Sequence, residues 1–172
     1  SGKPRFQKVL EKVMRESKWG RILPKGHGLG IAIHKSFGSI VGAVIEVSTD
    51  VNGMLNLNKA WIAIDCGKVI NPNTVRAQME GGFTFGLSAT LGEEITLKDG
   101  RVEQSNFHDY SILRLKGSPE ISVEIIESGN EIGGVGEVAV PLAAPALTNA
   151  IFSSSGRRIR SLPLSKHGIK IT

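Results

Sequence analysis

The sequence predicts an α+β fold in which hairpins of a mixed sheet pack against two long helices. Three observations support this fold class: an amphipathic pattern near the N-terminus, β-branched stretches separated by turn residues, and two later segments with helix-start signals that contain proline. The chain has 172 residues, of which 40% are hydrophobic, so it can bury a core and is too apolar for a disordered chain. We therefore expect a single domain over residues 1–172.

The first expected element is an amphipathic helix that Gly20 and Pro24 end. Its apolar residues repeat at helical spacing: Phe6, Val9, Leu10, Val13 and Met14. The glycines of residues 26–30 are spaced like a dinucleotide-binding turn, but such a turn follows a strand and opens a helix, whereas this segment precedes a strand. We expect these glycines to mark an entry bend or a close backbone approach.

Strands are expected over residues 29–37 and 39–48, with Gly38 at the corner between them. Asp50-Val51-Asn52-Gly53 is typical of a hairpin turn and leads into a third strand over residues 55–64. These hairpins form the body of the expected sheet.

The second helix begins at a capping signal, because Asn71 is a favourable N-cap and Pro72 suits the first helical position. We expect it to run to about Leu91. The amide residue Gln78 lies at helical spacing from three glycines: Gly81, Gly82 and Gly86. Each glycine costs a helix roughly 1 kcal/mol relative to alanine, which indicates a very close neighbour, either another helix or a ligand. Gln78 suits the edge of a heterocycle, and a Gln78 satisfied in a tightly packed core fits the residues equally well.

The loop over residues 65–72 places polar groups at the start of this helix, where a phosphate can be bound. Its Cys66 is the single cysteine of the chain, and we expect a small buried residue there rather than a nucleophile. A second hairpin is expected around residues 98–101, and a strand over residues 121–126.

Glu137 is the candidate catalytic carboxylate of the sequence. It follows the glycine run of residues 133–136 and precedes a helix expected to begin near Pro141 and to end at Gly156. Pro141 and Pro145 suit only the first turn of that helix or the residues before it. The alternative is a glycine-rich turn in which Glu137 caps the helix or compensates its dipole, and this segment by itself favours the alternative.

Composition excludes several classes of protein. One cysteine permits neither an intrachain disulfide nor a cysteine metal cage, and the four histidines lack ligand spacing, so no metal site made by the chain is expected. The apolar run over residues 138–152 is too short and too interrupted to span a bilayer. Both ends are basic within a total charge of +5, but the few aromatic residues disfavour base stacking. Nucleic-acid binding is therefore kept only as an alternative.

Several motifs together resemble the molybdenum hydroxylases, the xanthine dehydrogenase and aldehyde oxidase family, in the C-terminal part of the large (beta) subunit of the isoquinoline 1-oxidoreductase type. The resemblance runs from about Trp19 to Leu164. The motifs that carry it are Ile64-Asp65-Cys66-Gly67, Ile70-Asn71-Pro72, Gln78-Met79-Glu80-Gly81-Gly82, Gly134-Val135-Gly136-Glu137, Asn149-Ala150-Ile151-Phe152 and Gly156-Arg157-Arg158-Ile159-Arg160.

The resemblance implies a molybdenum–pterin cofactor, usually molybdopterin cytosine dinucleotide in bacterial members, and hydroxylation of N-heterocycles or aldehydes with water-derived oxygen. Glu137 matches the general base of the family, and Gln78 matches the glutamine that meets the cofactor. The remaining residues that the resemblance assigns to the cofactor are Asp65, Gly67, Asn71, Thr74, Gly81 and Gly136.

The large subunit of the family is several times longer than this chain. The resemblance therefore implies an incomplete cofactor site that the remaining large-subunit segments complete. It also implies a [2Fe-2S] electron-transfer subunit as a partner. By itself the chain is then expected to be inactive. The alternative, from another class of function, is a non-catalytic binding or scaffold module that keeps the fold. The sequence leaves the compartment open between bacterial cytoplasm and periplasm.

Overall fold

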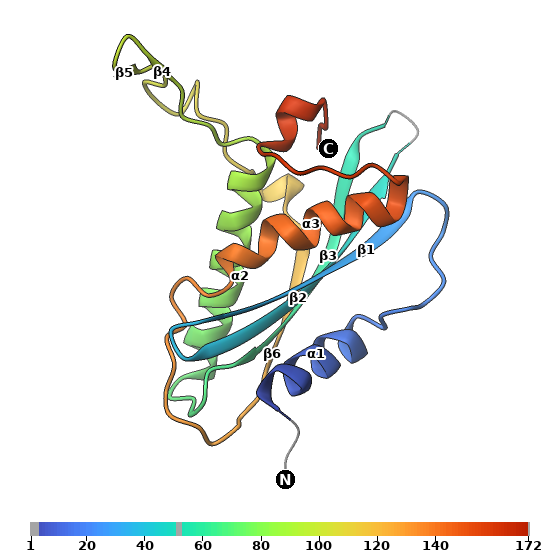
Figure 1. Cartoon of the computed structure of the whole chain (residues 1–172), viewed down its shortest axis with the longest axis vertical. Coiled ribbons are helices and arrows are strands. Elements are labelled where there is room, and N and C mark those ends of the chain that lie inside the picture. The colour runs from blue at the N-terminus through green and yellow to red at the C-terminus, as the bar shows by residue number, and fades with distance from the viewer. Residues whose placement is uncertain (1–3, 51–52, 172) are drawn as a thin grey trace.

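The computed structural model describes residues 4–50 and 53–171, in which a four-stranded mixed sheet separates one helix from a pair of helices (Figure 1). The first three strands form an antiparallel meander, and the fourth joins its edge in parallel with the third, which gives the order β1-β2-β3-β6. The strands are β1 (His27–Ser36), β2 (Ser39–Thr49), β3 (Leu55–Asp65) and β6 (Glu120–Ile125).

The two faces of the sheet are covered by different helices. Alternate residues of a strand point to opposite faces, so the odd-numbered apolar residues of β2, such as Ile45, lie in the larger core with α2 (Pro72–Leu91) and α3 (Val140–Ser155). The even-numbered Ile40 and Val44 lie in a smaller cluster with α1 (Arg5–Glu16).

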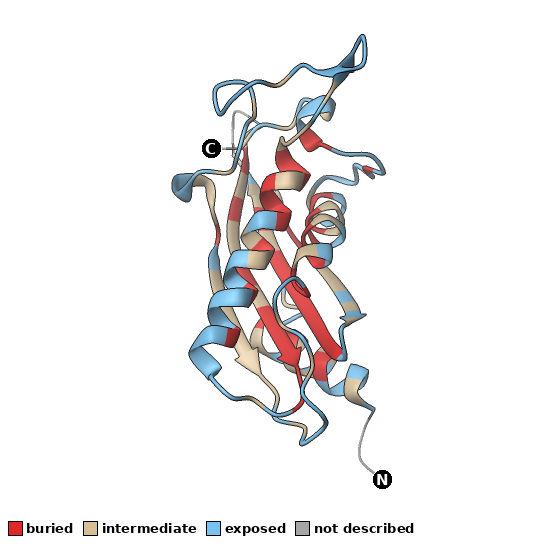
Figure 2. Ribbon diagram, turned by 90° about the vertical axis from the view of Figure 1, so that its left-hand side faces the viewer, coloured by how far each residue is buried: buried red, intermediate tan, exposed pale blue. Residues whose placement is uncertain are grey.

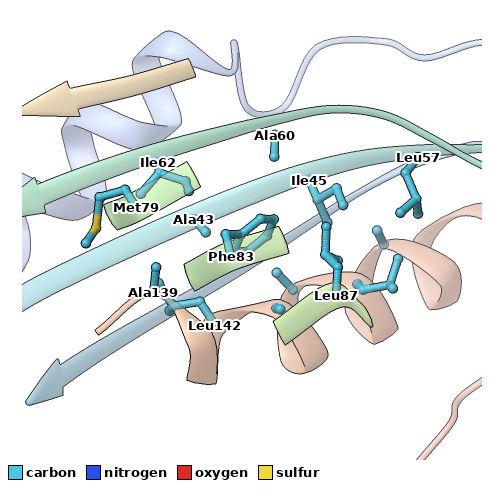
Figure 3. Close-up of a cluster of buried hydrophobic side chains, with 14 of the residues drawn as sticks. Ala43, Ile45, Leu57, Ala60, Ile62, Met79, Phe83, Leu87, Ala139 and Leu142 are labelled. Atoms are coloured by element: carbon cyan, nitrogen blue, oxygen red, sulfur yellow. The ribbon is translucent and has the colours of Figure 1, made fainter. Parts of the chain in front are cut away.

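The larger core is built around the buried face of α2. Met79, Phe83 and Leu87 are fully buried and point toward the sheet, where they meet Ile45 and Ile62 (Figure 3). The outward face of α2 is exposed along much of its first half (Figure 2). One side of this helix thus fixes its position, while the other is available to a ligand.

The expected elements are confirmed, with bounds that shift by a few residues at most. In the turn expected at Asp50-Val51-Asn52-Gly53, Val51 and Asn52 lie outside the described residues. The second hairpin is a short ladder of β4 (Leu97–Lys98) and β5 (Arg101–Val102) at the tip of an arm that projects from the body (Figure 1). Two short 3₁₀ helices complete the chain: η1 (Leu115–Gly117) and η2 (Leu164–His167).

The expectation for Pro145 is wrong. The last helix begins at Val140 and Pro145 lies inside it, beyond the first turn. Proline at this position leaves the carbonyl of Pro141 without its helical N–H partner. The buried Leu142, Ala146 and Leu147 hold the helix on the sheet despite that loss.

The glycines at the start of β1 permit a close approach of α3, as expected. A Cβ at Gly28 would overlap the carbonyl oxygen of Ala150, and one at Gly30 would overlap that of Ala146. The strand and the helix therefore touch through their backbones. No helix in the described part of the chain is long and apolar enough to cross a membrane.

Candidate functional site

A cavity of about 680 Å³ lies between the end of the β1–β2 hairpin, α2 and the start of α3. Its volume is in the range of small-molecule sites. Most of its wall is apolar or bare backbone, and its polar side chains are few. It is lined by His34, Ser36, Phe37, Gly81, Gly82, Phe85, Gly136, Glu137, Val140 and Pro141.

The start of α2 is fixed by its N-cap. The side-chain oxygen of Asn71 accepts hydrogen bonds from the backbone N–H groups of Asn73 and Thr74 at 3.0 and 3.1 Å. The cap is thus confirmed, but two of the free N–H groups expected to bind a phosphate are already paired. Asn71 and Thr74 line a separate cavity of about 180 Å³ together with Lys68.

The three glycines of α2 have different surroundings. A Cβ at Gly86 would lie 2.5 Å from the carbonyl oxygen of Val140 and 2.8 Å from the Cβ of Ala143, and one at Gly82 would lie 3.5 Å from the Cβ of Ala139. Gly81 has no neighbour within 4 Å of such an atom and faces the cavity. Helix packing therefore explains Gly86, whereas Gly82 would meet α3 only at ordinary contact distance and Gly81 leaves space for a ligand.

Gln78 is exposed, which excludes its alternative placement as a satisfied core residue. Its Nε2 donates a long hydrogen bond of 3.5 Å to the carbonyl oxygen of Gly136, the residue before Glu137. A bond at this limit is weak, so the amide keeps capacity for a stronger partner. Gln78 and Glu137 thus flank the same glycine.

The loop that carries Glu137 is hydrogen-bonded to the residue that directly follows β3 and to the turn between β1 and β2. The Gly133 N–H donates to the carbonyl oxygen of Cys66 at 2.9 Å, and the Gly134 N–H donates to that of Phe37 at 2.7 Å. The Ser39 hydroxyl donates to the carbonyl oxygen of Gly134 at 2.7 Å. These bonds hold the loop in place before the chain enters α3.

Glu137 itself is exposed and lines the cavity. The helix that follows has Ala139 as its N-cap and receives no side-chain capping bond. The capping alternative for Glu137 is therefore not supported. Only its backbone takes part in the helix start, where its carbonyl oxygen accepts from the N–H of Val140 at 3.1 Å.

Asp65 is completely buried and does not face the cavity. Its carboxylate accepts two bonds from Arg5, one from the Gly67 N–H at 3.0 Å and one from the Ser128 hydroxyl at 2.6 Å. Burial raises the pKa of the Asp65 carboxyl, but the bonds from Arg5, Ser128 and Gly67 outweigh burial and hold that pKa below its usual value. In this structure Asp65 orients the loops around the site instead of presenting an open ligand group.

Gly67 and Cys66 also act through packing. Gly67 has a φ of +74°, and a Cβ there would overlap the carbonyl oxygen of Glu131. Cys66 is buried as expected, and burial raises the pKa of its thiol. Of the residues expected to form the site, the structure brings Glu137, Gly136 and Gly81 to one cavity, with Gln78 beside them and Asn71 and Thr74 at the neighbouring one.

The end of the β1–β2 hairpin was not foreseen as part of the site. His34, Ser36 and Phe37 line the cavity opposite α2. Phe37 and Gly38 both have positive φ, +50° and +80°, as in the tight turns that join twisted strands. Gly38 signals this turn in the sequence, but nothing local indicates that the turn meets the loop before Glu137.

Among residues 4–50 and 53–171, no group of three His, Cys, Asp or Glu side chains is placed to hold a metal ion.

A family model described as "Molybdopterin cofactor-binding domain" matches residues 24–119. The chain is 36% identical over 165 residues to the beta chain of isoquinoline 1-oxidoreductase from Brevundimonas diminuta, covering 94% of this chain and 21% of that protein. It is 28% identical over 163 residues to the large chain of nicotine 6-hydroxylase from Paenarthrobacter nicotinovorans, covering 86% of this chain and 20% of that protein. The chain therefore spans about a fifth of the length of these relatives.

Solved structures agree with the sequence matches. Quinoline 2-oxidoreductase from Pseudomonas putida 86 superposes with a TM-score of 0.66 at 26% identity, over 73% of this chain and 17% of that one. Aldehyde oxidoreductase from Desulfovibrio desulfuricans gives a TM-score of 0.63 at 26% identity, over 73% of this chain and 14% of that one. On the match over residues 24–119 and these likenesses, the chain belongs to the molybdenum hydroxylase family, as a molybdopterin cofactor-binding domain.

Proposed function

We propose that this chain is the C-terminal, base-bearing portion of the large subunit of a molybdenum hydroxylase, in which Glu137 is the general base and Gln78 binds the cofactor. The observation that carries the proposal is the hydrogen bond from Gln78 to the carbonyl oxygen of Gly136, the residue before Glu137. This bond lies beside a cavity of about 680 Å³. A hydrogen-bonding amide and an open carboxylate thus lie next to each other on separate elements.

The residues around this point fit a molybdenum–pterin cofactor. A Cβ at Gly136 would meet only the Gln78 amide nitrogen, at 3.7 Å, so the backbone there is open to a close approach. The Gln78 amide can donate and accept, which suits the edge of a pterin. The small cavity at the start of α2, with Asn71, Thr74 and Lys68, is a second place for polar groups of the same ligand. For the dinucleotide we propose the cytosine form.

When bound, the cofactor supplies the two-electron oxidation and the activated, water-derived oxygen of the hydroxylation. Glu137 contributes the carboxylate that accepts a proton at the cavity wall, a role that typically accelerates a reaction by roughly 10²–10⁴-fold. The hydrogen bonds of Gly133 and Gly134 hold the loop that carries this residue. The apolar wall formed by Phe37, Phe85 and Val140 excludes water from one side of a bound ring.

The site requires further protein. Glu137 and Gln78 are exposed in this chain, and the cavity is open toward solvent on that side. We propose that the remaining segments of the large subunit cover them and supply the rest of the cofactor site, and that a [2Fe-2S] subunit receives the electrons. The substrates of this proposed enzyme are N-heterocycles or aldehydes.

The proposal is tested by the metal and nucleotide content of the whole assembled enzyme. We expect stoichiometric molybdenum together with stoichiometric CMP after acid hydrolysis. An assembled, folded complex that contains neither would contradict the cofactor assignment, and release of another nucleotide would overturn the cytosine form. The control variant is Ser48→Ala, which should keep the molybdenum and CMP content of the enzyme. Ser48 lies at the far end of β2, where its hydroxyl bonds to Asn58 at 2.9 Å.

A further inference from the structure

We propose that the Ser36 hydroxyl, at the end of β1, hydrogen-bonds the ring nitrogen of a flat heteroaromatic substrate held in the cavity beside Glu137. The inference rests on the proposed function, because it assumes that the reacting substrate lies within reach of Glu137. It adds a residue that distinguishes an N-heterocycle from an aromatic ring without nitrogen.

Ser36 carries a polar atom that the protein leaves unsatisfied. Within the described ranges, its Oγ is the one buried side-chain nitrogen or oxygen without a hydrogen-bond partner. Leaving a buried hydroxyl unpaired is unfavourable, and buried polar groups in proteins are nearly always paired. Ser36 also lines the cavity, and rotation of its side chain would turn the buried Oγ toward a ligand there, which can supply the missing partner.

The neighbouring side chains favour a planar ligand. Phe37 and Phe85 line the same cavity and are 68% and 63% exposed, so their surfaces remain available. Gly81 and Gly82 add bare backbone, against which a flat ring can lie closely. A few polar groups in a mainly apolar, aromatic cavity are typical of a site for a small aromatic molecule.

The backbone at this point belongs to the two-residue turn between β1 and β2. Phe37 is one of three non-glycine residues with positive φ in the described chain, at +50°, as this kind of turn requires. Here the Phe37 carbonyl oxygen accepts from the Gly134 N–H, so the turn that presents Ser36 is tied to the loop that presents Glu137.

The position of Gln78 separates the substrate side from the cofactor side. Gln78 approaches Gly136 but does not line the large cavity, whereas Ser36, Phe85 and Glu137 all do. A cofactor bound through Gln78 would reach Gly136 at the edge of this cavity. We assign the part of the cavity lined by Ser36, Phe85 and Glu137 to the substrate. His34, two residues before Ser36 on the same side of β1, adds a second polar group to this wall.

The test compares two probes of similar shape, isoquinoline and naphthalene, of which only the first has a ring nitrogen. Dissociation constants are measured by fluorescence or calorimetry on the whole assembled enzyme, reduced with dithionite so that no turnover occurs. For Ser36→Ala we expect isoquinoline binding to weaken about 3- to 10-fold, the loss of one net hydrogen bond, with naphthalene binding unchanged. Ser36→Thr, which keeps a hydroxyl, restores the preference, and Ser48→Ala leaves both constants unchanged.

An unchanged ratio of the two constants in Ser36→Ala would overturn the inference. Loss of molybdenum from an assembled Ser36→Ala complex that keeps this ratio would overturn it as well, since Ser36 would then contact the cofactor. Failure of the Ser36→Ala complex to assemble would also overturn it, since Ser36 would then contact another segment. The proposed function fails separately, through an absent cofactor or through a Glu137→Gln variant that still turns over. Binding to the reduced enzyme is measured without turnover. A failure of the Ser36 inference can therefore be distinguished from a failure of the proposed function.

Discussion

Asp65, the last residue of β3, accepts hydrogen bonds from Nε and Nη2 of Arg5 at 2.8 and 2.9 Å. Arg5 begins α1 on one face of the sheet, and Asp65 also binds Gly67 and Ser128 in the loops that support the site on the other side. One carboxylate thus connects α1, the β3 end and the segment that leads to Glu137. The contact was not foreseen, because Arg5 and Asp65 lie sixty residues apart in sequence.

We expect Asp65→Asn to lower the free energy of unfolding by about 1–3 kcal/mol at pH 7, because Arg5 loses its charged partner and the four hydrogen bonds to the carboxylate lose an ionised acceptor. The folded-state pKa of Asp65 lies below its usual value of 3.8. Its stabilising contribution is therefore complete above that value and is lost as the pH falls through the lower, folded-state pKa.

Urea unfolding at a series of pH values checks this prediction. The difference between wild type and Asp65→Asn should be constant near neutrality and shrink below about pH 4. Glu120→Gln is the control, since Glu120 pairs with Lys59 at the exposed sheet edge and should change stability by less than about 1 kcal/mol. A difference that stays the same down to pH 3 would argue against the ionised carboxylate as the cause.

Two glycines of α2, Gly86 on its packed side and Gly81 on its open side, should respond oppositely to alanine. Gly86→Ala is expected to destabilise the fold by about 1–3 kcal/mol, because its Cβ would press on Val140 and Ala143 of α3. Gly81→Ala is expected to stabilise it by up to about 1 kcal/mol, because alanine favours the helix and nothing lies within 4 Å. Thermal or urea unfolding measures both. Equal effects of the two variants would refute the division of α2 into a packed side and an open side.

Phe37→Asn should raise stability by about 1 kcal/mol, because asparagine tolerates the left-handed conformation better than phenylalanine. The same change removes an aromatic wall of the cavity, so binding of isoquinoline to the assembled enzyme should weaken. Unfolding and binding measurements on one variant separate the two effects. A destabilised variant with unaltered binding would mean that Phe37 serves packing alone.

Gln78→Ala should lower molybdenum and pterin content of the assembled enzyme while leaving the melting temperature of this domain nearly unchanged. The reason is that Gln78 is exposed and, among residues 4–50 and 53–171, makes only the long bond to Gly136, whereas a bond to a ligand contributes about 1–3 kcal/mol. Elemental analysis and thermal unfolding check it together. Normal metal loading combined with a large drop in melting temperature would favour a packing role for Gln78.

The 172-residue chain by itself should fold but hold no stoichiometric molybdenum and oxidise neither an N-heterocycle nor an aldehyde. The physical reason is the exposure of Glu137 and Gln78, which leaves a cofactor bound from one side. Elemental analysis after cofactor reconstitution, with a dye-linked assay, is the measurement. Near-stoichiometric metal with activity in this chain would contradict the proposed dependence on further segments.

Local signals in the sequence were sufficient for most of the secondary structure. The Asn71-Pro72 start of α2, the corner at Gly38 and the end of α3 at Gly156 each depend on backbone preferences of one or two residues, and all three are confirmed. Pro145 was misplaced because tertiary packing compensates for the hydrogen bond it removes.

Contacts between distant segments could not be predicted in the same way. The parallel pairing of β6 with β3, the burial of Asp65 by Arg5, and the closeness of the hairpin end to Glu137 depend on the whole topology. For the site, motif order indicated Glu137 and Gln78, but the surroundings of Ser36 required three-dimensional information.

The central claim, that Glu137 is the general base, is tested most directly by Glu137→Gln in the whole assembled enzyme. The amide has nearly the size of the carboxylate but cannot accept a proton at neutral pH, so we expect normal folding and molybdenum content. Single-turnover reduction by substrate should slow by at least about 10²-fold, while Glu131→Gln, a change in the same exposed loop, keeps the wild-type rate. A Glu137→Gln enzyme that retains most of its single-turnover rate would contradict the account.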